Sequence, residues 1–149
     1  MERTLLLHLR LKEAPITTNS AWKWGKGHCY LSKRVHQYRA AVQKAFDESK
    51  VPKREVWKDA VQAIVVACPR RKMDLDNMTK QLLDALKKVE PRVIEDDSQI
   101  VWITMKACLC RKCEIRSHIW LWGLPFATET EAEKVRLQRE RVRKRKRKE

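Results

Sequence analysis

The apolar run 63–68 constrains the fold more than any other segment of the chain. It closes the segment 57–68, it is rich in Val, Ile and Ala, and Pro69 stops it. A short, uninterrupted apolar run of this kind is typical of a strand that is buried on both faces of a sheet. The sequence therefore predicts a buried central strand, which delivers the chain directly to a group of basic and acidic residues.

Hydrophobic periodicity predicts the other elements. In the segment 5–11, the leucines at 5, 7, 9 and 11 fall on one face of an extended chain, with His8 and Arg10 on the other, which is the pattern of a half-buried strand. Residues 33–48 follow a good N-cap, Ser32, and carry apolar side chains at helical spacing, and 77–89 repeat that spacing close to Asp76. Residues 98–109 and 114–123 resemble two strands joined by a tight connection at 110–113. This order predicts an α/β (α+β) fold, with a small mixed β-sheet of about four strands and two main helices packed on it.

Residues 16–31 are predicted to form a mobile loop. They contain two glycines and lysines interleaved with tryptophans, a composition that suits contact with a sugar-phosphate backbone. Asn19, Lys23 and Lys26 are the candidate DNA contacts in this segment. The alternative is that Trp22 and Trp24 fold back onto the hydrophobic core, and the sequence favours neither interpretation.

The formal net charge is +15, and both parts of the chain are basic. Residues 134–149 hold ten of the 34 Lys and Arg and two of the 19 acidic residues, so they contribute +8 and residues 1–133 contribute +7. Such a balance favours a polyanionic partner, and nucleic acid is the expected one. We predict one domain over residues 1–125 and a basic, frayed or helical tail over 126–149 that neutralises phosphates.

Export signals are not evident in the sequence. The N-terminal apolar run is broken by His8 and Arg10 and is too short for a signal peptide, and the longest apolar run is far shorter than a membrane span. An intracellular, cytoplasmic protein with reduced thiols is therefore expected.

Three of the five cysteines are close together in the sequence. Cys108, Cys110 and Cys113, with His118 nearby, could bind zinc, but their spacing lacks the paired C-x2-C arrangement of common structural sites. Cys108 and Cys110 are also expected on the same side of one strand. Ordinary buried or hairpin thiols are the favoured interpretation.

The densest chemistry in the chain follows the predicted central strand. Asp74 and Asp76 are two residues apart, Lys80 comes one helical turn later, and Asp97 or its neighbour Asp96 precedes the next predicted strand. Carboxylate oxygens suit Mg²⁺, with Mn²⁺ as a substitute. A divalent cation neutralises charge during phosphodiester hydrolysis and activates water. The pattern predicts a metal-dependent nuclease site in which Lys80 approaches a phosphate oxygen or the leaving group.

A structural interpretation of the same residues remains open. Asp76 could be a helix N-cap, Asp74 a turn residue, and Lys80 one half of an ion pair with Asp76 or Asp84, while 95–97 could be a solvated turn. The chain would then be a non-catalytic basic nucleic-acid-binding protein with structural carboxylates. Such a protein binds strongly and salt-sensitively without cleavage.

The acidic pattern resembles a known family. Residues 74–77 (Asp-Leu-Asp-Asn), Lys80, 82–86 and 96–101 (Asp-Asp-Ser-Gln-Ile-Val) are similar to the core pattern of the RusA family of Holliday junction resolvases. The resemblance spans most of residues 5–122, and its specific part lies at 74–101. Further matching positions, which look like the family's N-terminal loop and first helix, are Pro15, Thr17, Asn19, Tyr30, Ser32, Tyr38 and Arg39.

The resemblance implies a small homodimeric endonuclease of bacteria or their phages. Such an enzyme binds four-way DNA junctions and makes paired, symmetric nicks with Mg²⁺, using one site per subunit. The resemblance also implies catalytic and metal-binding roles for Asp74, Asp76 and Asp97, with Asp96 as the register alternative, and a catalytic role for Lys80.

The basic residues before the first aspartate fit the same family. Arg70, Arg71 and Lys72 are expected to contact DNA. The sequence departs from the pattern at Met73, where a basic residue is expected, and this departure puts DNA affinity or turnover in question.

Overall fold

The computed structural model describes residues 3–53, 55–69, 74–108, 110 and 112–124. The predicted DNA contacts Arg70, Arg71 and Lys72, the departure at Met73 and the predicted tail 126–149 lie outside these residues. The elements are, in chain order, β1 (Thr4–Leu11), α1 (Thr18–Ala21), β2 (Trp22–Gly25), β3 (His28–Leu31), α2 (Lys33–Asp47), β4 (Val61–Ala67), α3 (Leu75–Lys87), the 3-10 helix η1 (Asp97–Gln99), β5 (Ile100–Ala107) and β6 (Ser117–Gly123).

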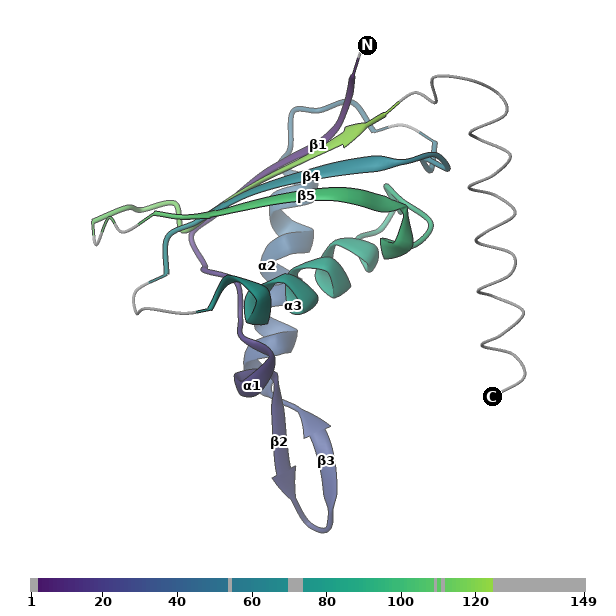
Figure 1. The fold of residues 1–149 in the computed structure, drawn as a ribbon. Coiled ribbons are helices and arrows are strands. Elements are labelled where there is room, and N and C mark those ends of the chain that lie inside the picture. The colour runs from purple at the N-terminus through teal and green to yellow at the C-terminus, as the bar shows by residue number, and fades with distance from the viewer. Residues whose placement is uncertain (1–2, 54, 70–73, 109, 111, 125–149) are drawn as a thin grey trace, which may run out of the picture.

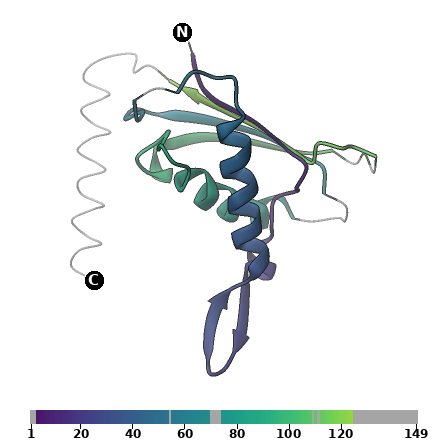
Figure 2. The ribbon, with the colours of Figure 1, turned by 180° about the vertical axis from the view of Figure 1, so that it is seen from behind.

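Four strands form one mixed sheet in the order β1-β6-β4-β5. β6 pairs antiparallel with both β1 and β4, and β4 pairs parallel with β5. The helices α2 and α3 both lie against one side of this sheet (Figures 1 and 2). The predicted fold, a mixed sheet of four strands with two main helices packed on it, is confirmed.

The apolar run is the centre of the sheet, as predicted. Val61, Ala63 and Val65 of β4 are fully buried, because β4 has a strand on each side and the helices cover one of its faces. The predicted apolar stripes of the two helices supply the rest of this core, chiefly Val35, Tyr38, Val42 and Phe46 from α2 and Met78, Leu82, Ala85 and Leu86 from α3. Burial of this apolar surface is the main force that holds α3 in place.

The prediction of a tight connection between the last two strands is wrong. β5 and β6 are not neighbours, because β4 lies between them. β4, α3 and β5 instead form a parallel crossover, in which the helix returns the chain to the starting end of the sheet. β5 is left at the sheet edge, where Val101 and Trp102 are 59% and 60% exposed.

The prediction of a loop over 16–31 is also wrong. The segment forms α1 and a β2–β3 hairpin that projects from the body of the molecule (Figure 1). Lys26 and Gly27 form its two-residue turn with φ of 50° and 77°, the pair of positive values that matches the twist of a hairpin. Trp22 and Trp24 are 48% and 76% exposed, so the alternative that they fold back onto the core is wrong as well.

Within the described part of the chain, no helix is both long and apolar enough to cross a membrane.

Candidate active site

Asp74 and Asp76 lie at the start of α3. Asp74 occupies the N-cap position with extended backbone dihedrals, and Asp76 lies in the first turn. The two residues therefore do not lie in one extended segment. The Asp74 side chain accepts no capping hydrogen bond from the helix backbone; its Oδ2 accepts one from Asn77 Nδ2 at 3.4 Å. Both carboxylates are exposed, so their oxygens remain available to a ligand.

The start of α3 favours negative charge for a structural reason. The helix macrodipole places partial positive charge there, which attracts anionic groups. Lys80 follows one turn later and is exposed. Among the ion pairs of the described residues, none joins Lys80 to Asp76 or Asp84, so the structural pairing considered from the sequence is not formed.

Asp97 lies at the opposite end of α3. Its Oδ1 is 3.8 Å from Nζ of Lys87, which is the last residue of α3. Asp76, by contrast, is the second residue of that helix. Eleven residues of helix separate Asp76 from Lys87, which is about 16 Å along the axis. The strands β4 and β5 are neighbours, but they run parallel, so the entry to β5 lies at the end of the sheet opposite to the exit from β4. Within one chain, Asp97 is therefore not brought together with Asp74 and Asp76.

Asp96 and Asp97 have different roles in the structure. Asp96 is the N-cap of η1, and its Oδ1 accepts a hydrogen bond from the Ser98 backbone N–H at 2.9 Å. That bond lowers the pKa of Asp96 to about 2. The pKa of Asp97 is raised, chiefly by its hydrogen bond with Asp96. Asp96 thus caps η1, whereas the Asp97 side chain contacts those of Asp96 and Lys87.

Gln99 fixes this acidic segment, a role that was not predicted from the sequence. Its Oε1 accepts hydrogen bonds from the backbone N–H groups of Glu95 and Asp96 at 2.7 and 2.9 Å. Its Nε2 donates to the carbonyl oxygens of Trp57 and Asp59 at 2.7 and 3.0 Å. The side chain is 1% exposed and uses both ends of its amide. The capping-box spacing of Asp96 and Gln99 was the available signal.

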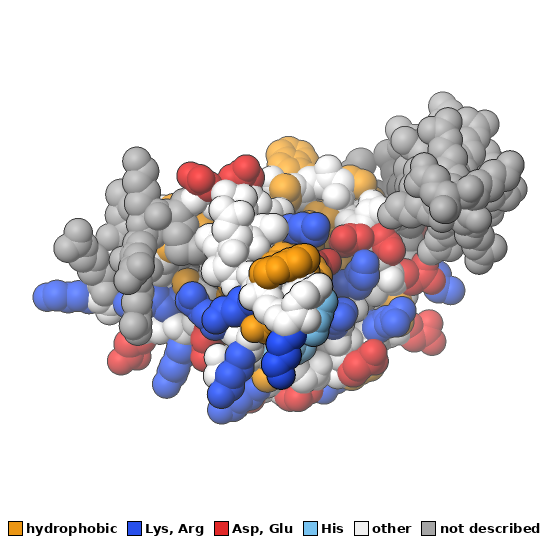
Figure 3. Space-filling view, turned by 90° about the horizontal axis from the view of Figure 1, so that it is seen from below, with side chains coloured by type: hydrophobic (Ala, Val, Ile, Leu, Met, Phe, Trp, Pro, Cys, Tyr) orange, Lys and Arg blue, Asp and Glu red, His pale blue; other side chains and the backbone are white. Residues whose placement is uncertain are grey.

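The β2–β3 hairpin presents three exposed aromatic side chains. Trp22, Trp24 and Tyr30 are accompanied by the exposed lysines Lys23 and Lys26. Figure 3 views this side from below, where Lys and Arg side chains surround exposed hydrophobic ones. Aromatic faces beside cations suit unpaired bases and phosphates.

The short helix α1, which leads into the hairpin, contacts α3 directly. Thr18 Oγ1 donates a hydrogen bond to the carbonyl oxygen of Asn77 at 3.0 Å, which joins α1 to the first turn of α3. Asn19, the neighbouring predicted DNA contact, is exposed. The structure thus brings Asn19 and the base of the hairpin to the start of α3, beside Asp76.

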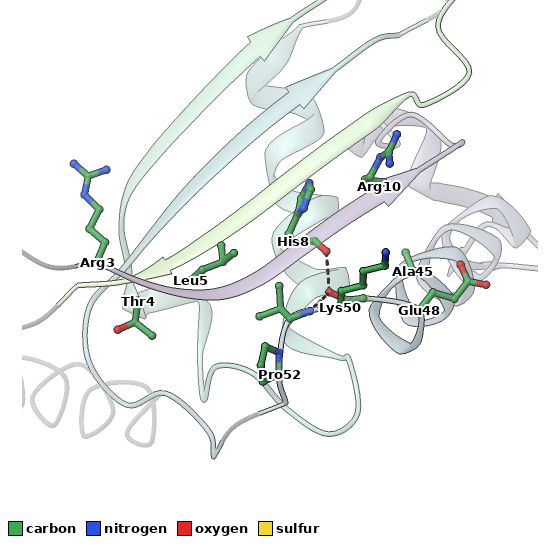
Figure 4. Close-up of a pocket in the computed structure, with 11 residues that line it drawn as sticks. Arg3, Thr4, Leu5, His8, Arg10, Ala45, Glu48, Lys50 and Pro52 are labelled. Carbon is green, nitrogen blue, oxygen red and sulfur yellow. Dashed lines mark hydrogen bonds between the residues drawn. The ribbon is translucent and has the colours of Figure 1, made fainter.

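A well-defined hollow lies elsewhere on the molecule. A groove of about 920 Å³ runs between β1 and the segment that follows α2, with Arg3, Arg10, Lys50 and His8 among its lining residues (Figure 4). None of the predicted catalytic residues lines it. The carboxylate site is an exposed surface, as a site for a large polymeric substrate can be.

Comparison with known proteins identifies the family. The sequence model of endodeoxyribonuclease RusA matches residues 13–119, more than two thirds of the chain. The chain belongs to the RusA family. RusA proteins are endodeoxyribonucleases that resolve Holliday junctions, so this chain is an enzyme that acts on branched DNA. The interpretation as a non-catalytic binding protein is therefore set aside. No curated protein matches the sequence.

RusA-family resolvases typically use divalent metal ions. The donors at the start of α3 fit such an ion: hard cations such as Mg²⁺ are usually held by one or two carboxylates together with substrate phosphates and water. Asp74 and Asp76 are exposed and are not engaged in ion pairs within the described residues. Two carboxylates without a cation would repel each other, so a bound cation also relieves that repulsion.

Proposed function

We propose that this RusA-family enzyme resolves four-way DNA junctions by paired symmetric nicks, with Mg²⁺ as its metal and Mn²⁺ as a substitute. The observation that carries the proposal is the pair of exposed carboxylates, Asp74 and Asp76, at the start of α3 and within the matched region. A divalent ion bound there supplies charge neutralisation at the phosphate and a more acidic water.

The remaining side chains bind and orient the substrate. Lys80 lies on the exposed surface one turn beyond Asp76, where its ammonium group can donate to a phosphate oxygen or to the departing oxygen. Trp24 and the hairpin lysines Lys23 and Lys26 would contact the strands that open at a junction. The Lys and Arg side chains of residues 70–72 and 134–149 add an attraction to DNA phosphates that does not depend on the DNA sequence.

A second subunit offers a way to complete the site with Asp97. β5 is an edge strand with exposed apolar side chains, a surface that another strand can cover. If two copies of β5 pair antiparallel about a two-fold axis, the start of each lies beside the end of the other. The end of β5 is beside the end of β4, which leads to Asp74. The partner's Asp97 would then approach Asp74 and Asp76.

Cleavage of a synthetic four-way junction tests the proposed chemistry. Wild type should introduce symmetric nicks that require Mg²⁺ or Mn²⁺. Asp76→Asn should abolish nicking while junction binding is retained, because the amide keeps the size of the side chain and loses the charge that holds the cation. A wild-type protein that binds junctions and leaves them intact with either metal would refute the proposal.

Mixed dimers distinguish a shared site from a site within one chain. Asp76→Asn and Asp97→Asn subunits should each be inactive alone. Mixed together, they form dimers in which one site combines an intact Asp76 with the partner's Asp97, so single-strand nicking should return without paired cutting. If each chain supplied its own Asp97, both sites of the mixed dimer would be defective and no nicking would return.

A further inference from the structure

Four cysteines meet where three strands of the main sheet begin or end. Cys68 follows β4, Cys108 follows β5, and Cys110 and Cys113 lie in the connection to β6. Figure 1 shows this connection and the end of β4 at the same end of the sheet, at the left of the view. The sequence predicted Cys108 and Cys110 on the same side of one strand. The strand β5 ends at Ala107, however, so both cysteines lie beyond it and their side chains can converge.

The sulfur atoms lie at the spacing of metal ligands. The Sγ atoms of Cys68, Cys108 and Cys113 are all within 4.8 Å of one another, and those of Cys108 and Cys113 are 4.0 Å apart. In a tetrahedral site with Zn–S bonds of about 2.3 Å, neighbouring sulfurs are about 3.8 Å apart. The Cys110 thiol joins this group through a hydrogen bond with Cys113.

The four thiols differ in pKa. Burial raises the pKa of Cys68, and the hydrogen bond with Cys110 raises that of Cys113 to about 12, whereas Cys108 and Cys110 ionise more readily than an ordinary thiol. A hydrogen bond from the Cys110 backbone N–H is the main cause that lowers the pKa of Cys108. A hydrogen bond from the Cys113 thiol is the main cause that lowers the pKa of Cys110, and the Lys112 backbone N–H adds to it. Amide N–H groups that donate to ligand sulfurs are the usual outer partners of a thiolate metal site.

We propose that the chain binds a structural Zn²⁺ ion through four thiolates, those of Cys68, Cys108, Cys110 and Cys113. The site differs from the one considered from sequence, because Cys68 takes the place of His118. The His118 ring instead stacks on Trp120 with 5.7 Å between the ring centroids. Cys68 comes forty residues before Cys108, so only the parallel pairing of β4 with β5 brings the two together.

The proposed ion fastens the end of β4 to the connection before β6. The backbone already joins these segments, since Cys68 N–H donates to the Arg116 carbonyl and Cys108 N–H donates to the Ala67 carbonyl, both at 2.7 Å. Arg116 also donates from Nη1 to the Cys68 carbonyl at 3.3 Å, which places positive charge beside the thiolates. Cys68 lies six residues before Asp74, so the zinc site anchors the chain that leads into the catalytic carboxylates.

Zinc analysis of the full-length reduced protein tests the proposal without any cleavage assay. Wild type should carry stoichiometric zinc after removal of loosely bound metal. Replacement by Co²⁺ should give the charge-transfer and visible bands of tetrahedral thiolate coordination. Cys110→Ser should weaken zinc binding by about a hundredfold, because each of four thiolates carries roughly a quarter of the binding free energy.

Cys29 provides a matched control. It is an exposed cysteine on the hairpin strand β3, so Cys29→Ser should leave both the zinc content and the cobalt spectrum unchanged. Cys68→Ser should also lose zinc, but Cys68 is buried, so the exposed Cys110 keeps the test independent of folding.

Three results would overturn the zinc site. The first is reduced, remetallated wild type without bound zinc or a cobalt thiolate spectrum. The second is Cys110→Ser that binds zinc as tightly as wild type. The third is a disulfide among the four cysteines in protein isolated under non-oxidising conditions, seen as two fewer titratable thiols. None of these depends on Mg²⁺-dependent nicking, so failure of the zinc site and failure of the proposed nuclease chemistry are separate observations.

Discussion

Thr18 and Asn77 join α1, the helix that leads into the β2–β3 hairpin, to the first turn of α3. The Thr18 hydroxyl donates to the Asn77 carbonyl oxygen at 3.0 Å, and Asn77 directly follows Asp76. The contact spans 59 residues of sequence and ties α1 to the helix turn that carries Asp76.

Thr18→Val should therefore slow junction cleavage more than it weakens junction binding. The substitution keeps the shape of the side chain and removes one hydrogen bond, at a cost of about 1 kcal/mol in the free energy of unfolding. Thr18→Ser keeps the hydroxyl and should cleave at close to the wild-type rate. Thermal unfolding and nicking rates measure the two effects. Equal nicking rates in Thr18→Val and wild type would show that the hairpin does not position the helix.

Trp24→Ala should weaken junction binding without destabilising the fold. The indole is 76% exposed, so its removal leaves the core intact. Loss of one stacked base should cost about 1–3 kcal/mol of binding free energy, roughly tenfold to a hundredfold in Kd. Trp24→Phe retains an aromatic face and should keep most of the affinity. Fluorescence anisotropy with a labelled junction gives Kd, and an unchanged Kd for Trp24→Ala would exclude the stacking role.

Asp96→Ala should lower stability at neutral pH by about 1 kcal/mol, the usual value of a lost N-cap, whereas Asp96→Asn should retain the cap. The pKa of Asp96 is lowered from 3.8 to about 2, so its ionised form stabilises the fold above pH 4, and this contribution is lost as the pH falls toward 2. Between pH 4 and pH 2, the free energy of unfolding of Asp96→Ala should therefore depend less steeply on pH than that of wild type. Chemical denaturation at several pH values measures this dependence.

The hydrogen bond between Asp96 and Asp97 also affects the titration of Asp97. Its pKa is raised chiefly by the hydrogen bond with Asp96, so the contribution of Asp97 to stability is present at low pH and is lost as the pH rises through its folded value. Asp96→Asn removes the neighbouring carboxyl group and should lower the pKa of Asp97. NMR titration of the Asp97 carboxyl carbon detects this shift, and an unchanged or higher pKa would contradict it.

Gln99→Leu should destabilise the domain by at least about 3 kcal/mol. The change leaves two backbone N–H groups and two carbonyl oxygens without the hydrogen bonds that Gln99 makes to them. Each buried unsatisfied group costs about 1–3 kcal/mol. Gln99→Glu should also destabilise the domain, because its buried carboxylate can accept from the two N–H groups but turns an oxygen toward the two carbonyl oxygens. Denaturant unfolding at neutral pH should place both variants below wild type, and a variant as stable as wild type would contradict the role of Gln99.

The sequence by itself determined the elements whose signal is local. The apolar run at 63–68 predicted the central strand, and the apolar stripes predicted α2 and α3, because burial on one face imposes a periodicity that can be read along the chain. The short motif at 74–80 identified the family and named Asp74, Asp76 and Lys80. The hairpin at 22–31 was missed because its alternating side chains are mostly exposed, so no buried face marks the strands.

Only the tertiary structure decided which distant residues meet. The sequence placed Asp97 with Asp74 and Asp76, but parallel pairing of β4 and β5 sends the two groups to opposite ends of α3. The same pairing brings Cys68 to Cys108 across forty residues of chain. Strand order and direction depend on how whole elements pack together, and no local pattern of residues records them.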